Sequence, residues 1–193
     1  MTTKGGPRRH FTATGFVVDG DRTLLHWHRR HQQWMPPGGH IEPDEDPVQA
    51  VLREVREETG IAAEVVPTAP SFPFSSPGQI QPPYTILVED IPGPEEPHQH
   101  IDLIYFCRPL AGAGHDPALG DFHWIDEQAL AVNEPIALAA CGVAVPLAKD
   151  VRLLALKAIE TARAMGNQKD ERGQGDQPLS DFQSPVSDRG KDG

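Results

Sequence analysis

The sequence predicts an α/β sandwich with a mixed β-sheet, and three observations support this fold class. Segments typical of strands are interspersed with two helical patterns, and most strand segments precede the last helix. Apolar residues and glycine together make up about 46% of the chain, within the usual ~45–50%, so a normal core can form. Glycine (18) and proline (20) make up about 20% of the 193 residues, against a usual ~12%, which disfavours an all-helical bundle.

The first half of the chain begins with a predicted β-hairpin and continues into a predicted helix. Residues 11–19 and 23–29 are rich in β-forming residues, and a Gly-Asp pair supplies the turn between them. Over residues 46–59 the pattern becomes helical, because apolar residues recur at i, i+3, i+4 and i+7. Gly60 is a natural stop after this helix. The members of the apolar stripe are Val48, Val51, Leu52 and Val55.

The second half of the chain is expected to contain a long extended loop, further strands and a final helix. Residues 67–97 carry nine of the twenty prolines, so this region must be mostly loop, and long loops in compact domains are often functional. Short strands are expected at 62–66, 84–88, 98–108 and 122–125, and a patterned helix at about 146–165.

The length of 193 residues favours a single domain. The last 28 residues contain one Leu, one Val and one Phe, so they bury too little apolar surface to become ordered. We therefore expect a flexible N-terminus at 1–9, a folded domain at 10–165 and a disordered tail at 166–193. The two cysteines, Cys107 and Cys141, are too few for a disulfide framework and are expected to be buried thiols in a reducing cytosol.

The net charge of −11 restricts the expected partners of the chain. It repels nucleic-acid backbones and anionic lipid, so neither a nucleic-acid polymer nor a membrane is an expected partner. The sequence shows no signal peptide and no membrane-spanning segment, so a cytoplasmic protein is expected, with a homodimer as one possible assembly. A small anionic substrate is compatible with this charge if metal ions bridge it to carboxylates.

A stripe of carboxylates on the predicted helix is the most informative local feature. At about 100° per residue, Glu54, Glu57 and Glu58 share one ~100° sector that borders the apolar face. Like charges this close repel each other, and a hard divalent cation such as Mg²⁺, which prefers oxygen ligands, would relieve the repulsion. Two other interpretations are an ordinary solvated acidic face and a Ca²⁺-binding structural helix, although the latter lacks the alternating oxygen loop of known calcium sites.

The spacing around this stripe matches the motif G-x5-E-x7-R-E-U-x-E-E-x-G-U, in which U is apolar. The matching residues are Gly39, Glu45, Arg53, Glu54, Val55, Glu57, Glu58, Gly60 and Ile61. Seven fixed residue types at ~7% usage each would match by chance with a probability on the order of 10⁻⁶ in a chain of this length. The sequence therefore resembles the Nudix hydrolases, and the resemblance implies the α/β/α sandwich of that family up to about residue 165.

The resemblance implies a divalent-metal-dependent pyrophosphohydrolase, in which water attacks a phosphorus of a nucleoside diphosphate linked to another group. The implied ligands of Mg²⁺ or Mn²⁺ are Glu54, Glu57, Glu58 and the backbone carbonyl of Gly38. Glu57 is also a candidate general base, Arg53 would serve catalysis by orienting the glutamates, and Glu45 would be a structural or outer-shell group. The alternative is a Nudix-like module that binds a nucleotide without turnover. Such modules often lose a metal glutamate, so the intact set favours an enzyme.

Weaker candidates lie outside the motif. His100 and Asp102 alternate with a preceding histidine, so a strand would place all three on one face as a base, a substrate contact or an additional metal position. The alternative is a polar start of a strand with solvated histidines. Arg29, in a basic cluster at a strand end, is either a phosphate contact or part of a solvated surface. Glu95 and Glu96 lie in the loop where several Nudix relatives place an extra catalytic acid.

Overall fold

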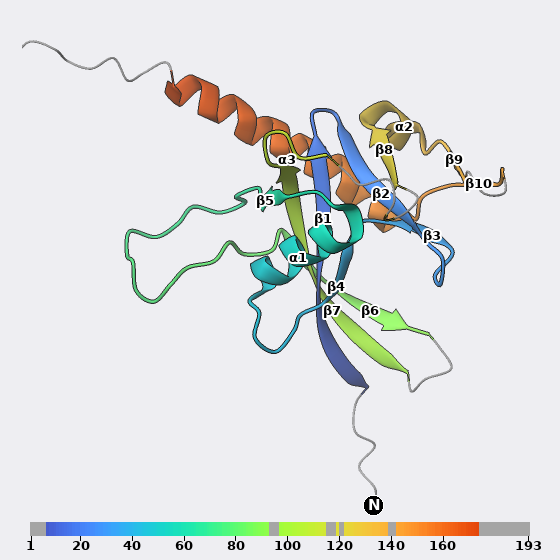
Figure 1. Cartoon of the computed structure of the whole chain (residues 1–193), viewed down its shortest axis with the longest axis horizontal. Helices are drawn as coiled ribbons and strands as arrows, with labels where there is room; N and C mark the ends of the chain where they lie inside the picture. Colours follow the sequence, from blue (N-terminus) through green and yellow to red (C-terminus); the bar gives the residue numbers. More distant parts are fainter. Residues whose placement is uncertain (1–6, 93–96, 115–118, 120–121, 139–141, 174–193) are drawn as a thin grey trace, which may run out of the picture.

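The computed structural model describes residues 7–92, 97–114, 119, 122–138 and 142–173 of the chain. Figure 1 labels the elements, which are in chain order β1 (Arg8–Asp19), β2 (Arg22–His28), β3 (Gln33–Met35), β4 (Gly38–His40), α1 (Pro47–Thr59), β5 (Ala63–Val65), β6 (Thr85–Ile91), β7 (His98–Pro109), β8 (Phe122–Asp126), α2 (Glu127–Val132), β9 (Ile136–Ala137), β10 (Ala144–Val145) and α3 (Lys149–Gly173). Within these ranges, no helix is long and apolar enough to cross a membrane.

A mixed sheet of eight strands forms the centre of the described structure. Strands β1 and β7 run parallel and pair over ten residues, from Arg8 opposite His98 to Val17 opposite Cys107. The strand order is β3-β2-β1-β7-β5, with β4 paired to β1, β6 to β7 and β8 to β2, and these other pairings are antiparallel. The mixed sheet predicted from the sequence is therefore confirmed.

Helices α1 and α3 cover opposite faces of this sheet, which gives the protein three layers (Figure 1). Because successive residues of a strand point to opposite faces, Val17 of β1 belongs to the core under α1, whereas Phe16 and Val18 belong to the core under α3. The expected α/β/α sandwich is confirmed. Cys107 is a buried thiol, as expected, and Cys141 lies outside the described residues. The helical members of the two cores are Ala50, Val51 and Val55 from α1, and Val151, Ala155, Ala158 and Ile159 from α3.

Both ends of helix α1 are set by its own sequence. The N-cap Asp46 accepts hydrogen bonds from the backbone N–H groups of Val48 (2.8 Å) and Gln49 (2.9 Å), and the Gln49 side chain accepts one from the N–H of Asp46 (2.9 Å). At the other end, Gly60 adopts a φ of 76°, a left-handed conformation that glycine enters without strain. The predicted helix is confirmed, and its caps fix the position of the carboxylate stripe along the chain.

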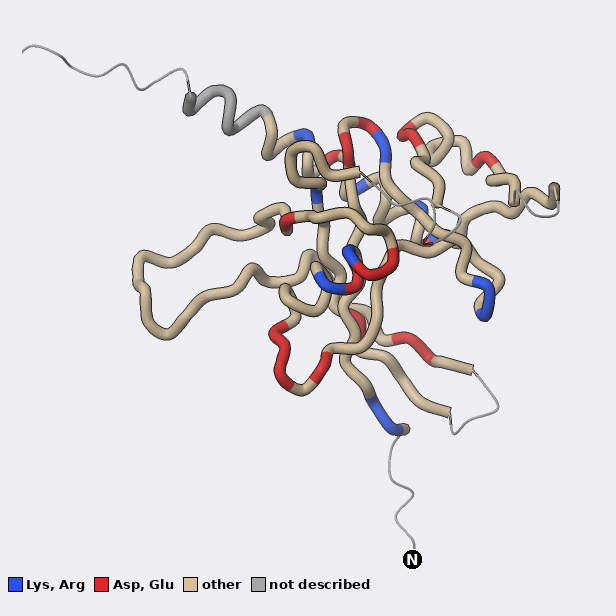
Figure 2. The backbone as a smooth tube through the Cα atoms, in the orientation of Figure 1, with Lys and Arg blue, Asp and Glu red and all other residues tan. Residues whose placement is uncertain are grey.

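The segment between β5 and β6 extends away from the sandwich as a long loop (Figure 1). Residues 66–84 carry no charged side chain, and Figure 2 shows the contrast with the acidic segment that leads into α1. The side chain of Gln79 crosses the loop, accepting a hydrogen bond from the N–H of Phe72 (2.8 Å) and donating one to the carbonyl of Phe74 (2.7 Å). The expected loop is confirmed, although the strand predicted at 84–88 has the longer bounds of β6.

Several boundaries differ from the sequence-based expectation. The short elements β3, β4, α2, β9 and β10 were not predicted, because segments of two to six residues show too little periodicity. The fold also exceeds the expected domain of 10–165, since β1 begins at Arg8 and α3 continues to Gly173. Gly166 does not end α3, because one glycine costs only about 1 kcal/mol in a helix that propagates through its neighbours. Residues 174–193 of the expected tail lie outside the described residues.

Candidate active site

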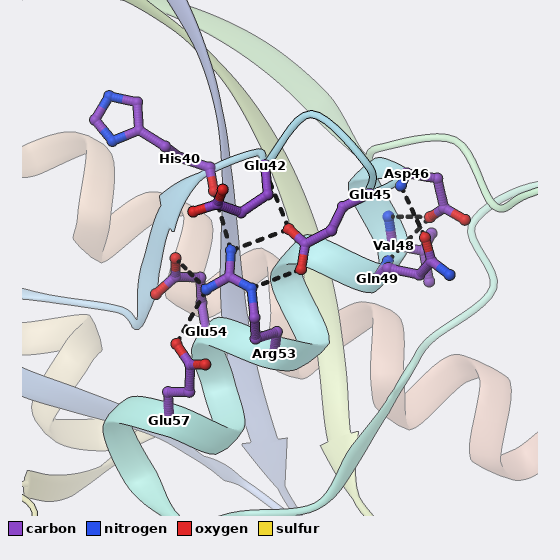
Figure 3. A network of polar contacts seen from close by, with 9 residues as sticks. All are labelled: His40, Glu42, Glu45, Asp46, Val48, Gln49, Arg53, Glu54 and Glu57. Atoms are coloured by element: carbon purple, nitrogen blue, oxygen red, sulfur yellow. Dashed lines mark hydrogen bonds and ion pairs between the residues drawn. The ribbon is translucent and has the colours of Figure 1, made fainter.

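The carboxylates around α1 are gathered by the guanidinium group of Arg53 (Figure 3). It donates two hydrogen bonds to Glu45, at 2.6 and 3.0 Å, and one each to Glu54 at 2.8 Å and Glu57 at 3.0 Å. A further hydrogen bond of 3.1 Å goes to the backbone carbonyl of His40 in β4. Arg53 thus joins the loop before α1, two glutamates of the helix and strand β4.

Arg53 also balances the negative charge that the stripe concentrates. Its hydrogen bonds to Glu45 and then to Glu54 raise its own pKa, so it remains cationic. The same contact holds the pKa of Glu45 below its usual range. The side chains of Arg53 and Glu54 are 26% and 15% exposed, so solvent screens their contact only in part. Arg53 therefore offsets the charges of Glu45, Glu54 and Glu57 through an ion-pair network.

Glu58 is the glutamate of the stripe that contacts the backbone of β4 and a histidine of β2. Its Oε2 accepts a hydrogen bond from the backbone N–H of Gly38 at 3.1 Å, and Nε2 of His26 lies 3.8 Å from the same oxygen. Burial raises the pKa of Glu58 to about 7, opposed by the Gly38 hydrogen bond and aided by the charges of Glu54 and Glu57. Burial also lowers the pKa of His26 to about 4, so the two side chains do not form an ion pair at neutral pH.

Strand β4 brings its backbone close to the glutamates because it contains two glycines. A Cβ placed on Gly39 would lie 2.6 Å from Cδ of Glu54, so a larger residue at this position would displace this carboxylate. The neighbouring Gly38 contacts Glu58 through its N–H. Carboxylate and backbone carbonyl oxygens are the ligands that hard cations such as Mg²⁺ and Mn²⁺ prefer. The donor groups gathered here therefore fit a hard divalent cation.

A cleft of about 1070 Å³ begins at this glycine strand. Its walls come from β4, the N-terminal parts of β1 and β7, strand β6, the start of α3, and strands β2 and β3 with the turn between them. Gly38, Gly39 and His26 line the cleft and also contact the glutamate stripe. The volume is slightly above the ~300–1,000 Å³ usual for small-molecule sites. The cleft and the carboxylates therefore adjoin each other at β4, although Glu54, Glu57 and Glu58 do not themselves line the cleft.

The alternating residues predicted to share one strand face do so. His98, His100 and Asp102 of β7 all line the cleft. Asp102 is 4% exposed and accepts hydrogen bonds from the hydroxyls of Thr12 (2.8 Å) and Thr14 (3.0 Å) in β1, while burial raises its pKa. Its carboxylate thus ties β1 to β7 from within the protein. His98 and His100, in contrast, are surrounded by other histidine rings.

The remaining weaker candidates lie elsewhere. Arg29 is in the exposed turn after β2, and its neighbour Arg30, not Arg29, lines the cleft. Strand β2 ends at His28, one residue before the predicted end, so the turn changes which side chain faces the cleft. Glu95 and Glu96 lie outside the described residues.

Glu89 of β6 is a cleft residue that the sequence analysis missed. It lies opposite His100 of β7, and burial, followed by the charges of Asp102 and Asp150, raises its pKa to about 7. The alternation within β6 could have indicated this residue, since Leu87, Glu89 and Ile91 share one face of the strand and all line the cleft.

Comparisons with known proteins agree with this geometry. The sequence matches the family described as NUDIX domain over residues 8–138. It is similar to the CTP pyrophosphohydrolase of Escherichia coli (strain K12), with 38% identity over 98 residues that make up 48% of this chain and 72% of that protein. The asymmetrical bis(5'-nucleosyl)-tetraphosphatase of Mus musculus is 57% identical over 30 residues, which cover 16% of this chain and 20% of that protein.

Among solved structures, a NUDIX-family hydrolase from Clostridium perfringens has the same fold, with a TM-score of 0.63 and 24% identity over 80% of this chain and 99% of that one. The family match covers well over half of the chain and includes α1, β4 and β7, which carry the carboxylate stripe and much of the cleft. Nudix enzymes typically depend on divalent metal ions. The chain therefore belongs to the NUDIX domain family and is a pyrophosphohydrolase of that family.

Proposed function

We propose that the protein hydrolyses a nucleoside diphosphate linked to another group, with Mg²⁺ or Mn²⁺ held at the glutamate stripe of α1. The observation that carries the proposal is the arrangement of three glutamates next to the glycine strand β4 and the cleft: Arg53 holds Glu54 and Glu57, and the N–H of Gly38 holds Glu58. This arrangement supports a complex in which the diphosphate meets the carboxylates through cations while the rest of the ligand lies in the cleft.

The residues around β4 would share the binding of the cations. Glu54 and Glu58 lie against the glycine strand, Glu57 lies one turn of α1 after Arg53, and the carbonyl of Gly38 would be a further ligand. Bound cations would neutralise the diphosphate and lower the pKa of the attacking water. Arg53 would keep Glu54 and Glu57 oriented by the hydrogen bonds it already donates to both.

Glu57 is the best-placed candidate for the general base. Its side chain is 60% exposed, against 15% for Glu54 and 30% for Glu58, so it is the most accessible to a water molecule. Its Oε2 accepts a hydrogen bond from Arg53, and its Oε1 would take the proton of the attacking water.

The similarity to a CTP pyrophosphohydrolase makes nucleoside triphosphates the first substrates to test, followed by oxidised nucleotides and nucleotide sugars. The net charge of −11 favours a small nucleotide over a nucleic-acid polymer. A nucleotide sensor without turnover is the second candidate, and the presence of all three glutamates argues against it.

A substrate screen with the purified chain tests the proposal. Nucleoside triphosphates and other nucleoside diphosphate derivatives are incubated with Mg²⁺ or Mn²⁺, and the released phosphates and nucleoside monophosphate are measured. We expect at least one compound to yield a nucleoside monophosphate, and chelation of the metal to stop the reaction. A chain that binds nucleotides but releases no product with either metal would be a sensor, and the proposal would be wrong.

A further inference from the structure

Four histidines gather where β1, β4 and β7 meet at the wall of the cleft. The parallel register of β1 and β7 places His10 directly opposite His100, with His98 two residues before His100 on the same face. Strand β4 adds His40, which lies opposite Thr12 of β1. The ring centroid of His10 lies 5.0 Å from that of His98 and 5.2 Å from that of His40. The ring centroids of His40 and His100 lie 5.0 Å apart.

The ring nitrogens of this cluster are close enough to share one ion. His10, His98 and His100 each offer one nitrogen, and these atoms all lie within 4.8 Å of one another. In addition, Nε2 of His10 and Nε2 of His100 are buried and have no hydrogen-bond partner among the described residues. Buried polar atoms are almost always paired, so two such atoms in one cluster call for a ligand.

His40 is arranged to orient one member of the cluster. Its Nε2 lies 3.1 Å from Nδ1 of His10, within hydrogen-bonding distance. This contact uses the one nitrogen of His10 that is not orphaned, and it leaves Nε2 of His10 available to the shared centre. Histidines that bind metals usually have their second nitrogen fixed in this way by a neighbouring group.

We propose that His10, His98 and His100 bind one transition-metal cation of the zinc class, with His40 positioning His10 from outside the coordination sphere. Three imidazoles and one open position form a known arrangement for Zn²⁺, with Zn–N distances of about 2.0–2.1 Å. Since all three histidines line the cleft, a water or an oxygen of a bound molecule would occupy the fourth position.

The chemistry of the ligands separates this site from the glutamate stripe. Imidazole nitrogens suit Zn²⁺ and related transition metals, whereas carboxylate and carbonyl oxygens suit Mg²⁺. The proposal is independent of the reaction at the glutamate stripe.

The test is a calorimetric titration of the full chain with Zn²⁺ in a large excess of Mg²⁺, which occupies the carboxylates. We expect one bound Zn²⁺ per chain. The double variant His10→Ala/His100→Ala should lose this binding, and His40→Ala should weaken it by about 10–100-fold. The matched control is His31→Ala, which removes an exposed histidine of the same cleft outside the cluster and should bind Zn²⁺ as the wild type does.

Two further measurements distinguish zinc at the histidines from zinc at the glutamates and from misfolding of a variant. Glu54→Gln should keep full Zn²⁺ binding, because the glutamate stripe is a separate site. In the unsubstituted chain, the ring ¹⁵N signals of His10, His98 and His100 should shift on Zn²⁺ addition while that of His31 stays in place, and this measurement needs no variant to fold. No stoichiometric Zn²⁺ binding, equal loss in His31→Ala, or loss in Glu54→Gln would each overturn the proposal.

Discussion

Two sets of proposed metal ligands meet at strand β4, and they differ in their hydrogen-bond partners. In the glutamate set, Arg53 donates to Glu54 and Glu57, and the N–H of Gly38 donates to Glu58. In the histidine set, two buried ring nitrogens have no hydrogen-bond partner among the residues described. Each of the three glutamates thus accepts a hydrogen bond from the protein itself, whereas two of the histidine ring nitrogens have no such partner among the described residues.

The difference in hydrogen-bond partners should affect how much free energy each set of side chains loses when it binds a cation. A cation at the glutamates must compete with the hydrogen bonds of Arg53, which are charge-assisted and therefore strong. A cation at the histidines would bind Nε2 of His10 and Nε2 of His100, which have no hydrogen-bond partner among the described residues, so it would not displace an existing contact of these two atoms there. The two sets should therefore respond to different ions and tolerate each other's removal.

The largest expected effect comes from removing a carboxylate of the glutamate set. Glu57→Gln and Glu58→Gln should each lower turnover by at least about 10²-fold, because metal and water positioning contribute much of the stabilisation of the transition state. Glutamine has nearly the same helix propensity as glutamate, so the fold should be retained. Steady-state kinetics on the substrate found in the screen checks this prediction, and near-normal rates in both variants would refute the assignment.

Removing the arginine should weaken both stability and activity. Arg53→Ala leaves Glu45, Glu54 and Glu57 without their shared donor, and we expect a loss of about 2 kcal/mol of folding free energy and a melting temperature lower by several degrees. Arg53→Lys should restore only part of this loss, because an ammonium group lacks the planar fork. Thermal melts measure the effect, with Arg56→Ala as control; an equal loss in that variant would contradict the specific role of Arg53.

Magnesium should raise the melting temperature through the glutamate set alone. An ion present at a hundredfold its Kd adds about 2.7 kcal/mol to the stability of the folded state, which corresponds to several degrees. Glu54→Gln should lose most of this response, and its stability without Mg²⁺ should fall slightly, because the variant also loses the ion pair with Arg53. Melts with and without Mg²⁺ on both proteins decide the point. If the two proteins respond equally, Mg²⁺ binds elsewhere.

The smallest effect is expected from shortening the C-terminus. Deleting 174–193 should change the free energy of unfolding by less than about 0.5 kcal/mol, because this segment contains only three large aliphatic or aromatic side chains. Deleting 166–193 should cost more, because it also removes residues 166–173 of α3. Thermal melts of the two truncated chains compare them. A loss of several degrees already in the shorter deletion would show that the segment packs on the domain.

The features that could be predicted from sequence are those with local signals. Helix α1 has its apolar stripe, cap and motif within a short stretch, and the first hairpin has its turn residues between two strands. The histidine cluster depends instead on register: His10 and His100 are 90 positions apart, and nothing in either segment shows that they lie opposite each other. The roles of the individual glutamates and of Arg53 stay predictions, because the positions of these side chains do not show which of them binds a cation or accepts a proton.

The parallel pairing of β1 with β7 also sets the order in which the two ligand sets can assemble as the chain folds. Helix α1 and its caps involve residues a few positions apart, so the glutamates can be aligned on a time scale set by local structure. The histidine cluster requires closure of a loop of about 90 residues, a slower event with a larger entropic cost. A nascent chain would therefore display its oxygen ligands before its nitrogen ligands exist as a group.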